Sequence, residues 1–304
     1  MNLDSNHQGA ALSLLQLYEK ELIEFKNVVE FLALFSGDKK VVRLVLTSEQ
    51  AHEVATALHL HLPEIDHGSS QYVLHEIFRS SLWDSFHERR KKAVEEHGDV
   101  RAHFFGQWQF VELAIVAEDD KADALELGEL FGIPTCCARQ YHETLNASGE
   151  WMPNYLYASQ AISSVDAVAN RFSSIVGYQM GFHNDYFPCS FDCEKTLEIS
   201  RANRGRLSLY GLDALVELAE NNSMGAAIAL DDHVFYRAGE SFRDILLSGE
   251  TVSTNGFEAL TPCAPNLPPA IAFSDSKLQA VECLDGGPVT HLSICFFETQ
   301  RDRL

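Results

Sequence analysis

The spacing of hydrophobic residues predicts helices over much of the chain. From Ala10 to Phe35 these residues recur every three or four positions, which predicts one long amphipathic helix broken near Asn27. The stretch Ser36-Gly37-Asp38 is typical of a helix end. The same spacing predicts further helices at residues 47–60, 81–97, 119–130, 136–145, 159–169, 167–175, 193–202 and 210–221.

Strands are predicted where short runs are rich in β-branched and aromatic residues. The alternation of apolar and polar residues is most regular from Trp108 to Ala117. Residues 62–70 are predicted as a loop, and Asp231-Asp232 as a turn between two strands. Other strands are predicted at residues 41–46, 72–78, 226–230, 234–238 and 292–297.

The order of these elements predicts an α/β (mixed α+β) fold. A strand followed by a helix indicates an N-terminal α/β region over residues 1–103. Residues 104–223 form a predicted core, mainly helical, that carries the cysteine motifs. Glycine, proline, serine and threonine between short apolar runs indicate a β-rich C-terminal lobe over residues 224–304. The length is also compatible with one compact domain.

Composition and charge limit the partners that the protein can bind. The net charge is −21 and the pI is near 4.9, which opposes binding to nucleic-acid backbones and anionic membranes. We therefore expect a small-molecule substrate, with no nucleic acid and no membrane as partners. The composition is also compatible with a homo-oligomer. No apolar run approaches the ~20 residues that span a membrane, and the first residues do not resemble a signal peptide, so we expect a cytoplasmic protein.

The candidate chemistry lies in two short motifs that each follow a proline. The first contains Cys136 and Cys137, and the second contains Cys189 and Cys193. The Cys-x3-Cys spacing of the second pair lets both sulfurs reach one point, on a helix face or in a turn. Thiolates bind zinc and the iron of iron–sulfur clusters, and cytoplasmic thiols stay reduced. The sequence therefore predicts one metal or cofactor site formed by these four cysteines.

Adjacent side chains diverge, so Cys136 and Cys137 are not both expected to bind one ion. We expect Cys137 to join Cys189 and Cys193, which leaves a fourth position for His183, Cys136 or substrate. Three thiolates that hold a four-iron cluster leave one iron open, whereas three thiolates and a histidine form a closed zinc site. Without a metal, Cys137 can act as a nucleophile at a helix N-terminus, or the cysteines are small buried core residues.

Four other residues are candidates for roles beside the cysteines. His183 and Asp185 can transfer protons, and His183 is alternatively a capped loop histidine. Asp192 is either a catalytic carboxylate or a helix N-cap. Arg139 can bind an anionic substrate, although a surface salt bridge is the commoner role of such an arginine.

The motifs of several enzyme classes are absent from the sequence. There is no G-x4-G-K-[ST] phosphate loop, no G-x-G-x-x-G after a strand, no G-x-S-x-G and no H-E-x-x-H. Residue 196 is threonine, so the Cys-x3-Cys spacing does not continue to a third cysteine. The usual cluster motif of radical enzymes that use S-adenosylmethionine is therefore missing.

The two cysteine motifs resemble those of a family of archaeal and bacterial proteins with no established activity. In that family a GYP-x-CC turn precedes a PCS-x-DC turn by some tens of residues. The matching stretches here are Phe131–Cys137 and His183–Cys193, and Ile133 departs from the family because an aromatic residue is usual there. The resemblance covers roughly residues 110–240, including the strand-like stretch Asp231–Phe235. It implies that the four cysteines act as a set.

The leading hypothesis from the sequence is an iron–sulfur enzyme that acts on a small molecule. Three or four of the cysteines would hold a 4Fe-4S cluster whose open iron binds substrate or sulfide, and His183 or Asp185 would transfer protons. An open iron suits non-redox sulfur transfer or a lyase reaction. The alternatives are a structural zinc protein that binds a ligand or partner, and a metal-free enzyme with a cysteine nucleophile.

Overall fold

The computed structural model shows a mixed α+β fold with two compact units. The first unit comprises Met1–Trp151, Asn184–Cys189 and Ala202–Leu212, and the second comprises Met152–His183, Ser190–Arg201 and Asp213–Leu304. The structure describes residues 5–73, 100–119, 124–148, 162–166, 181–182, 186, 188–190, 193–230, 233–238, 248, 250–259, 267–274, 277–280 and 292–298. The mixed α+β class is confirmed, while the division into three regions stays a prediction.

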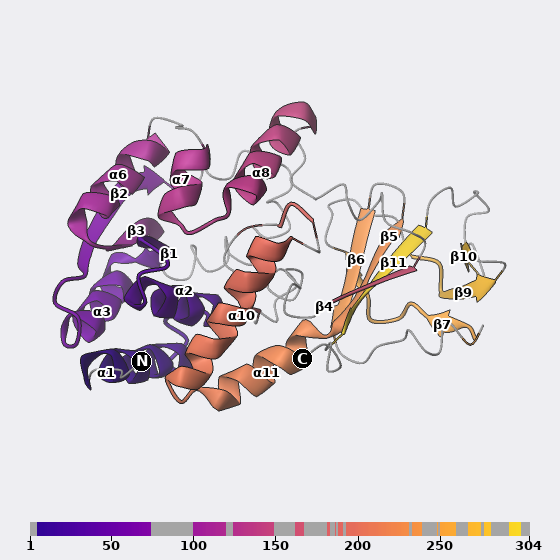
Figure 1. Ribbon diagram of the computed structural model, residues 1–304, viewed down its shortest axis with the longest axis horizontal. Coiled ribbons are helices and arrows are strands. Elements are labelled where there is room, and N and C mark those ends of the chain that lie inside the picture. The colour runs from indigo at the N-terminus through magenta and orange to yellow at the C-terminus, as the bar shows by residue number, and fades with distance from the viewer. Residues whose placement is uncertain are drawn as a thin grey trace. The chain divides into compact units, whose positions relative to one another are not determined.

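The first unit is built on a three-stranded antiparallel sheet in the order β1-β3-β2. Its strands are β1 (Val41–Thr47), β2 (Asp66–Val73) and β3 (Val100–Gly106). The central strand β3 is buried from Ala102 to Gly106. Its side chains are covered on both faces because helices pack on each side of this sheet (Figure 1).

Helices α6 (Trp108–Asp119) and α7 (Ala124–Leu130) cover one face of the sheet. Gly68 of β2 lets α6 approach closely, because a Cβ atom there would lie 2.6 Å from a methyl group of Val111. This layer stabilises the end of α7, which leads into the first cysteine motif. The buried residues of the layer are Val41, Ala102, Phe104, Val111, Ala114 and Leu130.

The opposite face of the sheet is covered by the N-terminal helices. Phe31 packs edge-on against Phe105 of β3, with ring centroids 5.5 Å apart. Phe105 follows Phe104 in the strand and therefore points to the other face. Helix α3 begins with a side-chain cap, because Thr47 Oγ1 accepts from the backbone N–H of Gln50 at 3.2 Å. The helices of this layer are α1 (Ser5–Glu19), α2 (Phe25–Phe35) and α3 (Ser48–His59).

Among the residues that the structure describes, the strands of the second unit form two sheets. The larger has the strand order β4-β11-β5-β6-β8, and the smaller has the order β10-β9-β7. Neighbouring strands are antiparallel except β4 and β11, which are parallel. Helix α11 (Asp213–Ser223) precedes β5. The strands are β4 (Ile162–Asp166), β5 (Gly225–Leu230), β6 (His233–Ala238), β7 (Val252–Ser253), β8 (Glu258–Ala259), β9 (Ala270–Ser274), β10 (Lys277–Ala280) and β11 (Leu292–Glu298).

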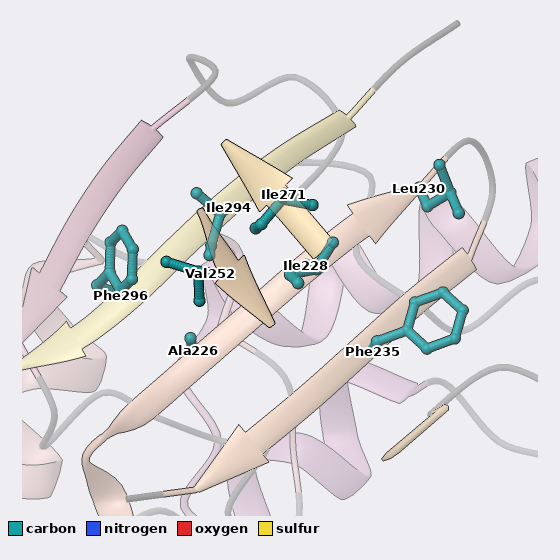
Figure 2. Packing of buried hydrophobic residues seen from close by; sticks show 8 residues of the cluster. All are labelled: Ala226, Ile228, Leu230, Phe235, Val252, Ile271, Ile294 and Phe296. Atoms are coloured by element: carbon teal, nitrogen blue, oxygen red, sulfur yellow. The ribbon is translucent and has the colours of Figure 1, made fainter. Parts of the chain in front are cut away.

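One hydrophobic core lies between the two sheets of the second unit (Figure 2). Ile228 of β5 is paired with Ile294 of β11 and with Phe235 of β6, so the three side chains lie on one face. The smaller sheet contributes Val252 and Ile271, which are paired with each other. The buried residues of this core are Ala226, Ile228, Leu230, Phe235, Val252, Ile271, Ile294 and Phe296.

Two helices begin at the cysteine motifs. They are α8 (Thr135–Ser148) and α10 (Glu194–Leu209), which confirm the helices predicted at 136–145 and 193–202. Among the helices that the structure describes, none is long and apolar enough to cross a membrane. The strands predicted at residues 41–46, 226–230, 234–238 and 292–297 are also confirmed, as is the helix at 47–60.

The strand predicted from Trp108 to Ala117 is wrong, because these residues form α6. The buried side chains Val111, Ala114 and Ala117 recur every three positions, as they do along one side of a helix. Most residues of this stretch are apolar, so a period of two and a period of three or four both fit it. The sheet and α7 bury these three side chains, and this burial favours the helix over the strand.

Three further predictions are wrong in part. Residues 162–166, predicted within a helix, form β4, and their partner β11 lies far along the chain. The loop predicted over residues 62–70 becomes strand β2 from Asp66 onward. The helix predicted from Ala10 to Phe35 with a break near Asn27 consists of α1 and α2, and the break lies instead around Glu21, a residue with φ of 58°.

Some predicted elements lie outside the described residues. These are the helices at 81–97 and 167–175, the turn Asp231-Asp232, and residues 74–78 of the strand predicted at 72–78. They stay predictions.

A buried ion pair connects α2 to the loop before β1. The Lys39 ammonium group donates to the Glu30 carboxylate, and the two side chains are only 3% and 5% exposed. Asn27 Nδ2 donates to the second carboxylate oxygen at 3.2 Å. The carboxylate is thus paired and hydrogen-bonded, as a buried charge requires.

Two histidines lie beside Phe105 on the sheet face that the N-terminal helices cover. His67 Nε2 and His103 Nδ1 are 2.8 Å apart, and the His67 ring stacks on both His103 and Phe105. Burial, and then the charge of His67, lower the pKa of His103 to about 4. Burial also lowers the pKa of His67. The folded protein therefore holds both rings neutral at neutral pH.

Glu30→Gln should lower the free energy of unfolding by roughly 3–5 kcal/mol, because the Lys39 ammonium group would stay buried without its counterion. Urea unfolding at pH 7 measures this loss. Glu129→Gln is the control, since it removes the same kind of pair, with Lys40, from the surface and should have little effect. Similar losses for both variants would contradict the prediction.

The stability of the protein should fall as the pH falls from about 6.5 towards 4. The pKa of His103 is lowered in the folded state, so the unfolded chain binds a proton in this range that the folded protein does not. The full effect is on the order of 3 kcal/mol. Urea unfolding between pH 7.5 and 5 measures the slope, which His103→Gln should reduce. An unchanged slope in this variant would rule out His103 as the cause.

Candidate metal centre

A tight turn between α7 and α8 places the first cysteine motif. Gly132 has φ of 68°, a left-handed conformation that glycine adopts without strain. Its N–H donates to Glu129 O at 3.2 Å, and the N–H of Ile133 donates to Gly128 O at 2.7 Å. These two bonds form a Schellman helix end. Pro134 then prevents α7 from continuing.

Both cysteines of the first motif lie in the first turn of α8. Pro134 O accepts hydrogen bonds from the N–H groups of Cys137 and Ala138, each at 2.9 Å. Cys137 is buried, whereas Cys136 is exposed. Their sulfur atoms are 3.9 Å apart, so the two adjacent side chains do not diverge.

The second motif joins the first through its backbone and its sulfurs. The N–H of Cys189 donates to Cys137 Sγ at 3.3 Å. Cys193 lies at the start of α10, where its N–H donates to Ser190 O at 3.2 Å and its carbonyl accepts from the Leu197 N–H at 3.0 Å. The hydrogen bond from the Cys189 N–H to Cys137 Sγ would orient a thiolate there and offset part of its charge.

The four sulfur atoms converge on one place. Cys136, Cys137, Cys189 and Cys193, here called the cysteine cluster, have sulfurs that all lie within 4.8 Å of one another. None of the four forms a disulfide. Four thiolates at this spacing can bind a metal ion.

The other predicted site residues fall into two groups. Arg139 lies exposed in α8, three residues after Cys136, and it forms no ion pair with any residue that the structure describes. His183, Asp185 and Asp192 lie outside the described residues. The roles predicted for all four residues, in catalysis and in substrate binding, stay predictions.

The loop before β1 holds the turn that precedes Cys136, and the sequence contained no recognised signal for this contact. The N–H of Lys40 donates to Leu130 O at 3.2 Å, at the end of α7. Lys40 Nζ also lies 2.8 Å from Glu129 Oε1, and this hydrogen bond lowers the pKa of Glu129. In the same loop, Asp38 forms an ion pair with Arg206 of α10. The loop thus contacts two of the helices that flank the cysteine motifs.

Comparisons with protein-family models, curated proteins and solved structures give no match for this chain.

Gly132→Ala should lower the free energy of unfolding by roughly 1–2 kcal/mol. Alanine disfavours the φ of 68° found here, and its Cβ atom would lie 3.2 Å from the Asp38 carbonyl oxygen. Chemical denaturation measures the loss.

Gly205→Ala is the matched control for this substitution. Gly205 lies within α10, and a Cβ atom there would have no heavy atom within 4 Å. This variant should gain up to about 1 kcal/mol from the higher helix propensity of alanine. A change of the same sign in both variants would contradict the account of the turn.

Proposed function

We propose that the cysteine cluster binds a single zinc ion through all four thiolates and that the ion has a structural role. The observation that carries this proposal is the convergence of four sulfurs within 4.8 Å. At a tetrahedral ion with zinc–sulfur bonds of about 2.3 Å, the sulfurs are separated by about 3.8 Å. The separation of 3.9 Å between the sulfurs of Cys136 and Cys137 is close to this value.

The sulfur spacing favours one ion over a four-iron cluster. In a 4Fe-4S cluster each of the four thiolates binds a different iron atom. The ligand sulfurs therefore stand further apart than they do around a single ion. The compact arrangement of the cysteine cluster suits the single ion better.

The surroundings of the sulfurs suit a negatively charged metal centre. Four thiolates outweigh the charge of one zinc ion, so the site carries net negative charge. Cys137 lies in the first turn of α8 and Cys193 at the start of α10, where the helix dipoles are positive. The N–H of Cys189 adds a hydrogen bond to Cys137 Sγ. The two helix dipoles and this hydrogen bond each support thiolate ligation.

A structural role follows from the number and position of the ligands. Four protein ligands fill a tetrahedral zinc site and leave no position for substrate. Cys137 and Cys189 are 52 positions apart in the chain, so one ion would connect distant segments. Because such a site does not exist in the unfolded chain, the binding free energy contributes directly to folding.

One observation favours a second candidate, an iron–sulfur enzyme. Cys136 is exposed, so substrate can take its place at an open iron held by the other three cysteines. In that case His183, Asp185 or Asp192 would transfer protons, and Arg139 would bind an anionic group of a small substrate. Sulfur transfer or a lyase reaction would then be the chemistry.

Protein purified anaerobically should be colourless and contain about one zinc ion per chain, as a closed four-thiolate site requires. Elemental analysis and an absorption spectrum measure this. A brown protein that contains iron and acid-labile sulfide would overturn the zinc proposal and support the second candidate.

Cys137→Ser should lose most of the bound zinc and lower the melting temperature, because it removes a buried ligand. At a free zinc concentration of about 100 times the dissociation constant, the bound ion contributes about 2.7 kcal/mol to the free energy of unfolding. Thr135→Ser, at the exposed first position of α8, is the control and should keep the ion. Equal zinc content in the two variants would contradict the proposed ligand set.

A further inference from the structure

The four residues of the cysteine cluster differ in their exposure to solvent. Cys136 is exposed, Cys189 is half-buried, and Cys137 and Cys193 are only 1% and 8% exposed. A small oxidant in solution therefore reaches Cys136 first. An accessible thiolate with a second cysteine beside it is the arrangement that redox-sensing cysteines use.

We propose that Cys136 is an oxidant-sensitive ligand, and that a hydroperoxide converts Cys136 and Cys189 into a disulfide and releases the metal ion. This inference rests on the proposed function, because it assigns a regulation to the same metal site. Oxidation would then remove the structural ion, and reduction of the disulfide would restore the ligands.

Cys189 is the partner that the geometry favours. Cys137 is adjacent to Cys136, and the Cα atoms of neighbouring residues are about 3.8 Å apart, shorter than the roughly 4.4–6.8 Å of ordinary disulfides. Cys193 is buried, and its backbone forms the start of α10. Cys189 lies before that helix, and its sulfur is within 4.8 Å of Cys136 Sγ.

The reaction proceeds in two balanced steps. The Cys136 thiolate attacks one oxygen of hydrogen peroxide, the O–O bond breaks, and the products are a sulfenic acid and hydroxide. The Cys189 thiolate then attacks the Cys136 sulfur, the S–O bond breaks, and a disulfide and a second hydroxide form. The two sulfurs together lose two electrons, which the peroxide gains.

Loss of two thiolate ligands would cause the release of the ion. Only Cys137 and Cys193 would remain as protein ligands, and a disulfide sulfur is a far weaker ligand than a thiolate. The stability that the ion contributes would be lost with it. The switch thus couples the redox state of one exposed sulfur to the folding energy of the site.

The test treats the zinc-loaded protein with hydrogen peroxide and follows released zinc with a chromogenic chelator. Peptide mapping under non-reducing conditions, after alkylation of the remaining thiols, then identifies the disulfide. Wild type should release its zinc together with formation of a Cys136–Cys189 disulfide. Cys136→Ser should release zinc more slowly, on the order of tenfold, and Thr135→Ser should behave as wild type.

Mapping of the metal-free protein keeps the test decisive if Cys136→Ser binds no zinc. In wild-type protein stripped of metal, peroxide should still give the Cys136–Cys189 disulfide, and in Cys189→Ser it should give a sulfenic acid at Cys136 that dimedone traps. A disulfide between other cysteines, or zinc retained under peroxide, would overturn the inference while leaving the zinc site intact. Wild-type protein that binds no metal would overturn the proposed function, whereas the disulfide map would still decide which cysteines react.

Discussion

A buried ammonium group requires a counterion, and this requirement determines the path of the chain before β1. Lys39 is almost fully buried, and the Glu30 carboxylate of α2 is its partner. The residues on either side of Lys39 are therefore held in place. Lys40 donates to the carbonyl of Leu130 at the end of α7, and Asp38 pairs with Arg206 of α10. One buried charge pair thus supports contacts to three helices.

The cysteine cluster depends on this support through the turn that follows α7. With the end of α7 held, the left-handed residue Gly132 and the following Pro134 direct the chain into α8. Cys136 and Cys137 then lie in the first turn of α8, where the helix dipole favours thiolate ligands. A metal ion bound there would add a second constraint, because it would act on the sulfurs of both motifs. Of the four cysteines, Cys137 and Cys193 are buried and Cys136 is exposed to solvent.

Local sequence signals predicted the elements whose causes lie within a few residues. The helix end at Ser36-Gly37-Asp38 and the helix that begins after Thr47 are both present. Prediction failed where distant residues decide the outcome. The stretch Trp108–Ala117 fits a strand or a helix until the sheet of the first unit buries Val111 on one side. Residues 162–166 form a strand because β11, distant in sequence, provides the hydrogen bonds.

For the candidate metal centre, the kind of ligand follows from the amino-acid sequence alone. Two proline-led motifs supply four thiols, and Pro134 and Gly132 set the turn before the first pair, because these residues restrict their own backbone. The position of Cys136 beside the other sulfurs depends on the fold, because it brings the second motif, distant in sequence, to the adjacent pair, whose sulfurs are 3.9 Å apart. The fold also sets which cysteine is exposed, because burial depends on packing between segments that are distant in the chain.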